Sequence, residues 1–392
     1  MLMALMTSLV ALSIDAMLPA LPNIARDLGV TGANDSQYVI SVIFLGLALG
    51  QIIYGPLSDS FGRKKPIYLG FALFIVGCLL SLFAPSYPIM LAGRLLQGLG
   101  AAGPRSVSLA LVRDLYEGDK MAEVMSYVMT IFILIPMLAP AYGQGIIALA
   151  NWQAIFASFI ALALVTVLWF AFRQPETLLP EARRPYTPAR LWIAVKEIFI
   201  TRTSLGYTLA AGFISGGFLG YLNSAQQIFQ DQYELGTLFP LYFATAAFAL
   251  GVASFANARL VLRFGMKRLA KTAVRVMLAL AEIAFLLFFF QMGTPPLWQF
   301  MVYLLATFFC IGILFGNLNA LAMQPLGHIA GVGAAVVGSL STFMSVPLGT
   351  AIGQSYNGTL LPLVGGLAVM GILTLGVMVW VEAGREARVI SH

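Results

Sequence analysis

Charge is scarce in this sequence. Only 10% of its 392 residues are charged, whereas soluble domains carry about a quarter, and 60% are apolar. This composition predicts that most of the chain is surrounded by lipid. The apolar stretches are continuous and rich in Leu, Ala, Phe and Met, which excludes the short alternating strands of a β-barrel. Because unpaired backbone groups are costly in lipid, the spans must be helices.

Residues suited to catalysis and metal binding are also few. The only histidines are His328 and His392, and the only cysteines, Cys78 and Cys310, lie far apart in apolar runs without metal-type spacing. No paired acids lie within a span, and no Gly-rich phosphate loop follows a strand. The sequence therefore disfavours a membrane-embedded enzyme or an ATP-driven pump, and it predicts neither a metal site nor a cofactor.

The long apolar runs set the fold class. A helical span needs about 20 apolar residues, which leaves room for about twelve, near residues 2–24, 37–58, 66–84, 88–112, 122–147, 152–173, 204–229, 238–260, 269–290, 297–322, 331–356 and 360–382. The first run lacks the basic start and cleavage pattern of a secretory signal, and we interpret it as a span. We predict an all-α integral membrane protein whose helices form two six-helix halves.

The longest interruption, residues 174–203, divides the chain. Its beginning has four prolines and mixed charge and cannot be a span. We therefore expect an amino-terminal bundle over 1–173 and a carboxy-terminal bundle over 204–392. Within the linker, one helical face is apolar and the opposite face is charged, which predicts an amphipathic helix lying on the membrane. The apolar face holds Leu191, Trp192, Val195, Ile198 and Phe199, opposite Arg190, Lys196 and Glu197.

Basic residues indicate the orientation. If the amino terminus is cytoplasmic, eighteen of the 22 Lys and Arg residues fall on the cytoplasmic side and only Arg26 on the other. Arg94, Arg105 and Arg275 lie inside spans. The positive-inside rule then places both termini and the linker in the cytoplasm. The net charge of +6 reflects this topology and does not indicate nucleic acid binding.

The turn between the second and third spans is the strongest local signal. It reads Gly55-Pro56-Leu57-Ser58-Asp59-Ser60-Phe61-Gly62-Arg63-Lys64-Lys65-Pro66. A tight turn needs Gly62, and Asp59 at the membrane edge can form a charge-assisted pair in one conformation and lose it in another. The alternative is a charged loop that only obeys the positive-inside rule.

This segment resembles motif A of the major facilitator superfamily, and three further segments agree. Leu91 to Ala102 is similar to motif B, Asp15 to Pro19 resembles the acid-then-proline signature of drug exporters, and Ala139 to Gly145 resembles antiporter motif C. Asp35-Ser36-Gln37 and Arg113-Asp114-Leu115-Tyr116 extend the similarity to drug:proton antiporters of the bicyclomycin-resistance (Bcr/CflA) type. The match covers the amino-terminal half. Motif C departs from the usual pattern at Ile131, and Thr7 stands where some relatives carry a second acid.

The resemblance implies a proton-coupled exporter of small amphiphilic compounds that works by alternating access in a bacterial-type inner membrane, as a monomer and without a cofactor. Motif A residues Gly55, Asp59, Gly62 and Arg63 would form the conformational switch. The alternatives are an exporter dedicated to one metabolite or siderophore and a nutrient symporter of the same fold. The motif C-like segment favours export over import.

Asp15 is the candidate proton carrier. It lies mid-span, where an ionisable group costs at least ~2.5 kcal/mol unless it faces water or a partner. Arg94 lies at comparable depth, so the two could exchange a proton for substrate, or they could form a static ion pair that locks spans one and four. Arg105, three turns after Arg94, is either a substrate contact or a snorkelling cation. On span nine, Arg275 and Glu282 suit a mutual structural pair.

Two further sets complete the candidates. Pro136, Pro140 and Gly143 would kink span five, either as a hinge or as a packing kink. Gly212, Gly216 and Gly220 form a small-residue ridge suited to helix packing. A wide apolar cavity with a few adaptable polar groups suits amphiphiles of varied shape, and its candidate residues are Arg105, Tyr127, Asn223, Gln226, Tyr242 and Asn319.

Overall fold

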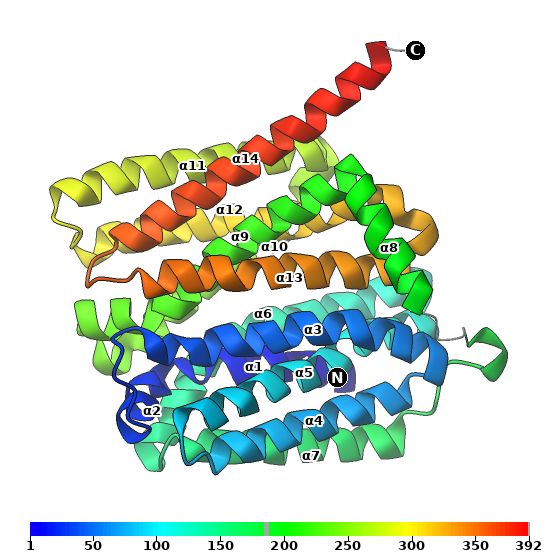
Figure 1. Ribbon diagram of the computed structural model, residues 1–392, viewed down its shortest axis with the longest axis horizontal. Coiled ribbons are helices and arrows are strands. Elements are labelled where there is room, and N and C mark those ends of the chain that lie inside the picture. The colour runs from blue at the N-terminus through cyan, green and yellow to red at the C-terminus, as the bar shows by residue number, and fades with distance from the viewer. Residues whose placement is uncertain (184–187, 391–392) are drawn as a thin grey trace. The chain divides into compact units, whose positions relative to one another are not determined.

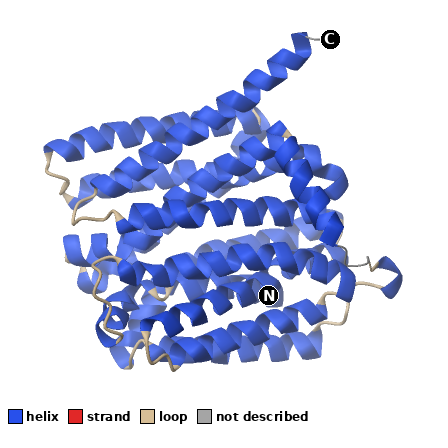
Figure 2. Ribbon diagram, viewed as in Figure 1, coloured by secondary structure: helices blue, strands red, loops and turns tan. Residues whose placement is uncertain are grey.

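The computed structural model describes residues 1–183 and 188–390 (Figure 1). Within those ranges every regular element is a helix (Figure 2). The long helices are α1 (Leu2–Asp15) continued by α2 (Leu21–Asp27), α3 (Tyr38–Phe61), α4 (Lys64–Leu82), α5 (Tyr87–Leu115), α6 (Gly118–Leu149), α7 (Gln153–Arg173), α9 (Arg202–Gln226), α10 (Phe239–Phe264), α11 (Met266–Phe290), α12 (Leu297–Met323), α13 (Ala330–Gln354) and α14 (Leu361–Ile390).

These helices confirm the predicted fold class. Ten stretches of the described chain are long and apolar enough to cross a membrane. One of them, Leu297–Gln354, contains both α12 and α13, and α5 falls outside the ten because arginines, glutamine and glycines interrupt it. When α12 and α13 are counted separately and α5 is added, the described residues contain the expected twelve spans.

The chain forms two compact units, Met1–Leu191 and Trp192–His392. The helix expected in the linker is present as α8 (Pro188–Ile200), in which Trp192 and Phe199 are exposed. Arg184 and the side chains of Arg190, Arg385 and Arg388, counted among the cytoplasmic charges, lie outside what the structure describes. The assignment of 1–173, 174–203 and 204–392 to two bundles and a linker remains a prediction.

Close backbone contacts hold α3, α4 and α5 together in the first unit. A Cβ on Gly98 would overlap the carbonyl oxygen of Ile43 on α3, and one on Gly46 would overlap that of Leu95 on α5. On another face of α5, a Cβ on Gly100 would overlap the backbone of α4. Small residues let helices approach closely in lipid. The sequence analysis did not find this packing, although both partner helices carry glycines.

In the second unit, the ridge of Gly212, Gly216 and Gly220 on α9 packs against α13. Side chains added at these positions would meet Met344, Leu348 and Ile352 respectively. The expected packing role of this ridge is therefore confirmed.

Helix α11 carries charged residues on its exposed face. Its buried face, which includes Leu269, Ala273 and Met277, packs against α12 and α14. Arg275 and Glu282 are both exposed on the other side. No ion pair joins them within the described chain, so the expected mutual pairing is wrong. They lie about 10.5 Å apart along the helix, and both side chains tilt toward its amino terminus.

Candidate functional site

The turn between α3 and α4 carries a dense polar network. Helix α3 ends at Phe61, Gly62 adopts a φ of 91°, and α4 begins at Lys64. That backbone conformation favours glycine. A Cβ at Gly62 would in addition meet the carboxylate of Glu176. The turn thus brings Arg63 to the ends of three helices.

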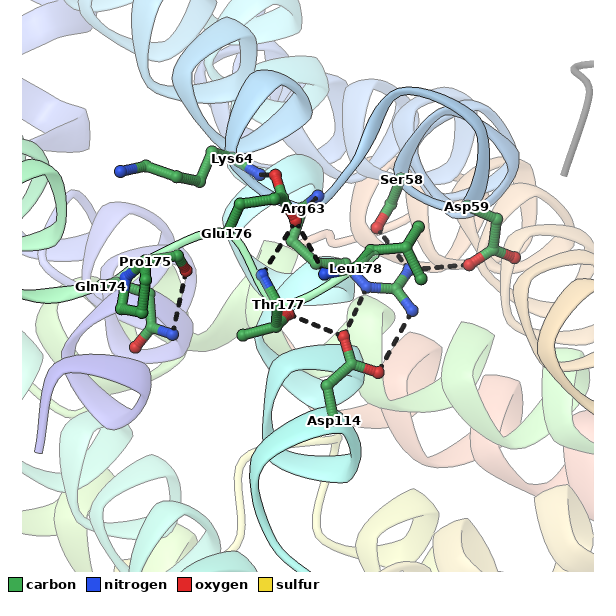
Figure 3. A network of polar contacts seen from close by, with 10 residues as sticks. All are labelled: Ser58, Asp59, Arg63, Lys64, Asp114, Gln174, Pro175, Glu176, Thr177 and Leu178. Atoms are coloured by element: carbon green, nitrogen blue, oxygen red, sulfur yellow. Dashed lines mark hydrogen bonds and ion pairs between the residues drawn. The ribbon is translucent and has the colours of Figure 1, made fainter. Parts of the chain in front are cut away.

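Arg63 is the centre of this network (Figure 3). Its Nη1 donates to Oδ1 of Asp59 at 2.7 Å and to Oγ of Ser58 at 2.8 Å. Its Nε and Nη2 donate to the two carboxylate oxygens of Asp114, at the end of α5, at 2.8 and 3.3 Å. The bidentate geometry is the strongest form of such a pair. Gly55 lies one turn before Asp59 on α3, outside this network.

Glu176, in the segment after α7, joins the network by accepting hydrogen bonds from backbone N–H groups. Its carboxylate accepts the N–H groups of Arg63 at 2.8 Å and Lys64 at 3.1 Å, and those of Thr177 and Leu178, both at 3.1 Å. The hydroxyl of Thr177 donates to Asp114 at 2.8 Å. A carboxylate at the amino terminus of α4 also complements the helix dipole. The sequence analysis missed Glu176, although an acid and a hydroxyl directly after span six were the available signal.

The charges of Arg63 and Glu176 are stabilised by these contacts. Burial lowers the pKa of Arg63, but its hydrogen bonds to Asp114 and Asp59 outweigh burial and raise the pKa above its usual value. Burial raises the pKa of Glu176, but the four backbone N–H groups outweigh burial and lower it. The carboxylate of Glu176 therefore stabilises the folded state at neutral pH. This contribution is lost as the pH falls through the lowered pKa.

We expect Glu176→Gln to loosen this end of the linker. The amide presents one acceptor oxygen instead of two, so protection of the Arg63, Lys64, Thr177 and Leu178 amides from hydrogen exchange should fall roughly tenfold at neutral pH. After correction for intrinsic rates, protection in the wild type should decline in acid, whereas the variant should show little pH dependence. The exposed Glu181 lies in the same segment, and Glu181→Gln is the control. Equal protection in both variants would contradict the capping role.

Helix α1 ends at Asp15 for a local reason. Pro19, four residues later, has no N–H to donate to the Asp15 carbonyl, and its ring crowds that position. The break in the α-helix comprises a turn at residues 16–17 and a 3-10 helix at Leu18–Ala20, after which the chain continues as the short α2. The side chain of Asp15 is only 5% exposed. Within the described part of the chain it makes no ion pair or hydrogen bond.

Arg94 on α5 is fully buried and donates hydrogen bonds to backbone carbonyls of α1 and α3. It donates to the carbonyl of Ser13 at 2.9 Å, to that of Val39 at 3.0 Å and to Oε1 of Gln97 at 2.6 Å. Its Nη2 has no partner in the described residues. The guanidinium therefore contacts α1 two residues before Asp15, through the backbone. The static Asp15–Arg94 ion pair considered above is not formed.

Helix α6 meets the break in α1 at Gly143. A Cβ at this position would overlap the carbonyl oxygen of Ala16, the residue after Asp15. Gly143 is therefore required by a backbone contact beside the candidate proton carrier. Pro136 and Pro140 lie within the same helix, which continues through both. Their role as a hinge stays a prediction.

The candidate cavity residues have varied environments. Asn223 is buried and donates to the carbonyl of Gly349 on α13 at 3.1 Å. Gln226 is also buried, and its amide lies 3.3 Å from the side-chain oxygens of Gln230 and Asp231. Tyr242 stacks on Phe229 with ring centroids 6.3 Å apart. Both buried amides are thus engaged in contacts within the second unit.

The other three cavity candidates are more accessible. Arg105 is half-buried on α5, and Tyr127 on α6 is 63% exposed. Asn319 is exposed and donates to the carbonyl of Phe315 on its own helix at 2.8 Å. Their contribution to a substrate site remains a prediction.

Comparison with known proteins identifies the family. The family model of the Major Facilitator Superfamily matches residues 3–353. The chain belongs to the major facilitator superfamily. Members of this superfamily are transporters of small molecules, so the chain is a multi-pass membrane transporter and not an enzyme.

Individual members of the superfamily are similar over nearly the whole chain. The uncharacterized MFS-type transporter YdgK of Bacillus subtilis is 31% identical over 90% of this chain and 87% of its own length. The bicyclomycin resistance protein homolog of Haemophilus influenzae is 28% identical over 95% of this chain and 93% of its own. A solved D-xylose-proton symporter shares the fold, with a TM-score of 0.71 at 14% identity, covering 97% of this chain and 96% of its own.

Proposed function

We propose that this transporter exports small amphiphilic compounds in exchange for protons, by alternating access. Two lines support the proposal: the resistance proteins among its relatives and the motif C-like segment, whose Gly143 contacts the break in α1. The proposed location is a bacterial-type inner membrane with both termini cytoplasmic, where the proton gradient replaces any cofactor. The cavity candidates would supply a few polar contacts for substrates of varied shape.

The observation that carries the proposal is the environment of Asp15. It is a buried carboxyl group at the end of α1, and none of the described residues forms a hydrogen bond or ion pair with it. Ionised, it would carry a charge at a position that is only 5% exposed, at considerable cost, whereas protonation removes that cost. Its charge state therefore biases the conformation of the broken helix. In the proposed cycle, Asp15 takes up a proton from the periplasmic side and releases it to the cytoplasm when substrate enters.

Arg94 and the Arg63 network have separate proposed roles. Arg94 fixes the backbone at Ser13, two residues before Asp15. In the proposed cycle its positive charge favours deprotonation of Asp15 in a conformation in which the two groups approach. The Arg63 network holds the cytoplasmic ends of α3, α4 and α5 together with the segment after α7. We propose that this arrangement belongs to one conformation of the cycle and that the Asp59 contact changes in another.

The direction of transport tests the proposal. Everted vesicles that contain the protein and hold a preformed ΔpH, acidic inside, should lose part of that gradient when substrate is added, because substrate entry is exchanged for protons. Vesicles that contain the Asp15→Asn variant should keep their ΔpH when substrate is added. Uptake into whole cells driven by an inward proton gradient would instead support the symporter alternative and overturn the export proposal.

A further inference from the structure

The outer face of α11 carries a polar stripe within a membrane-spanning helix. Arg268, Thr272, Arg275, Ala279 and Glu282 are all exposed, and their spacing of four, three, four and three residues places them on one side. The opposite side is buried against α12 and α14. Two exposed arginines thus share this surface with the exposed hydroxyl of Thr272.

Neither arginine has a partner in the described chain. No hydrogen bond or ion pair there involves Arg268 or Arg275, whereas the nearby Lys271 is paired with Glu382 of α14. An arginine directed at hydrocarbon is costly and is normally matched by an anion, by water or by a headgroup. The stripe therefore presents two positive charges that the protein itself does not compensate.

Geometry brings the two arginines toward one depth. Arg275 is the tenth residue of α11 and lies about 14 Å along the helix axis from its first residue. Side chains on a helix tilt toward its amino terminus, and arginine can extend several ångströms further toward the headgroups. That direction leads back past Thr272 toward Arg268. The first half of the stripe can thus present two guanidinium groups and one hydroxyl to a single anion.

We propose that Arg268, Thr272 and Arg275 bind the phosphodiester of an anionic phospholipid in the cytoplasmic leaflet. The proposal rests on the orientation proposed above, in which the amino terminus of α11 is cytoplasmic. Guanidinium groups match phosphate oxygens in shape and charge. Beside them, Val276 and Ile283 are 45% and 66% exposed and suit an acyl chain. The only acid of the stripe, Glu282, lies about two helical turns after Arg275 and about four after Arg268. Its negative charge is therefore too distant to repel an anion bound at Arg268.

The test measures lipid composition beside the stripe. Cys78 and Cys310 are buried, so a thiol-reactive fluorophore should label Val276→Cys selectively. The labelled protein is placed in liposomes containing equal amounts of phosphatidylglycerol and phosphatidylcholine, with one or the other brominated as quencher. Each arginine of the stripe should enrich the anionic lipid at the probe about fivefold at low salt, and the preference should weaken at high salt.

Arg275→Gln in the labelled protein should lower this preference about fivefold, and Arg275→Lys, which keeps the charge but not the planar guanidinium, should retain part of it. The matched control is Arg263→Gln, because Arg263 is an exposed arginine at the end of α10, outside the stripe. The proposed site would be overturned if the wild-type protein showed no preference for phosphatidylglycerol. It would also be overturned if Arg263→Gln lowered the preference as much as Arg275→Gln does. Orientation is checked separately by labelling Arg268→Cys with a membrane-impermeant thiol reagent in intact cells and in everted vesicles. Labelling only in everted vesicles supports the cytoplasmic location, and labelling in intact cells would overturn it.

Discussion

Replacement of Asp15 by asparagine is expected to abolish uphill export while substrate still binds. Asparagine preserves the shape and the hydrogen-bonding capacity of the side chain but cannot alternate between charge states. Asp15 is buried and has no partner in the described chain, so no other contact compensates for the lost titration. Substrate affinity should consequently become independent of pH, whereas in the wild type it should weaken as the pH falls and protons compete.

The measurement combines substrate affinity against pH with gradient-driven transport in proteoliposomes. Asp27→Asn is the matched control. Asp27 lies at the end of α2, where it accepts a hydrogen bond from the indole of Trp152 at 2.9 Å and pairs with Arg26. The control should retain uphill export. If Asp15→Asn still exports uphill at the wild-type rate, the proton moves through another group and the proposed coupling is wrong.

Gly143→Ala should damage both stability and transport. The added methyl group would overlap the carbonyl oxygen of Ala16, so α6 or the break after Asp15 must shift. Overpacking of this kind costs about 1–3 kcal/mol. Because the displaced backbone adjoins Asp15, we expect the apparent pKa of transport to change as well as its rate.

Gly145 provides an internal control two residues away on the same helix. A Cβ at Gly145 would have no neighbour within 4 Å, so Gly145→Ala should be neutral or slightly stabilising, since alanine favours a helix over glycine. Thermal unfolding in detergent and the pH profile of transport in proteoliposomes distinguish the two variants. If both leave these measurements unchanged, the contact between α6 and α1 has no role in transport.

Much of the fold follows from the sequence because hydropathy is a local property. The predicted span at 297–322 corresponds to α12 (Leu297–Met323), and the one at 152–173 to α7 (Gln153–Arg173). The helix in the linker was also predicted from a local pattern. Lipid makes such patterns informative, since any helix that crosses it needs an apolar run of known length.

The contacts that define the site depend on residues far apart in the sequence. Arg63 and Glu176 are separated by 113 positions, and no periodicity relates them. The partners of Arg94 were missed for a different reason. Two of them are backbone carbonyls, at Ser13 and Val39, and every residue has a carbonyl. The motif A segment predicted a charge-assisted pair for Asp59 within the turn, and its partner Arg63 lies only one turn away in the sequence.

The Arg63 network has a mechanical consequence. It joins the end of α3, the start of α4, the end of α5 and the segment that follows α7 through the guanidinium of Arg63 and three carboxylates, those of Asp59, Asp114 and Glu176. A force that pulls any of these four segments is transmitted to the other three through Arg63 and Asp114. While these contacts hold, the four segments are expected to move together, and a displacement of Glu176 or Thr177 is transmitted to the ends of α3 and α5 and to the start of α4.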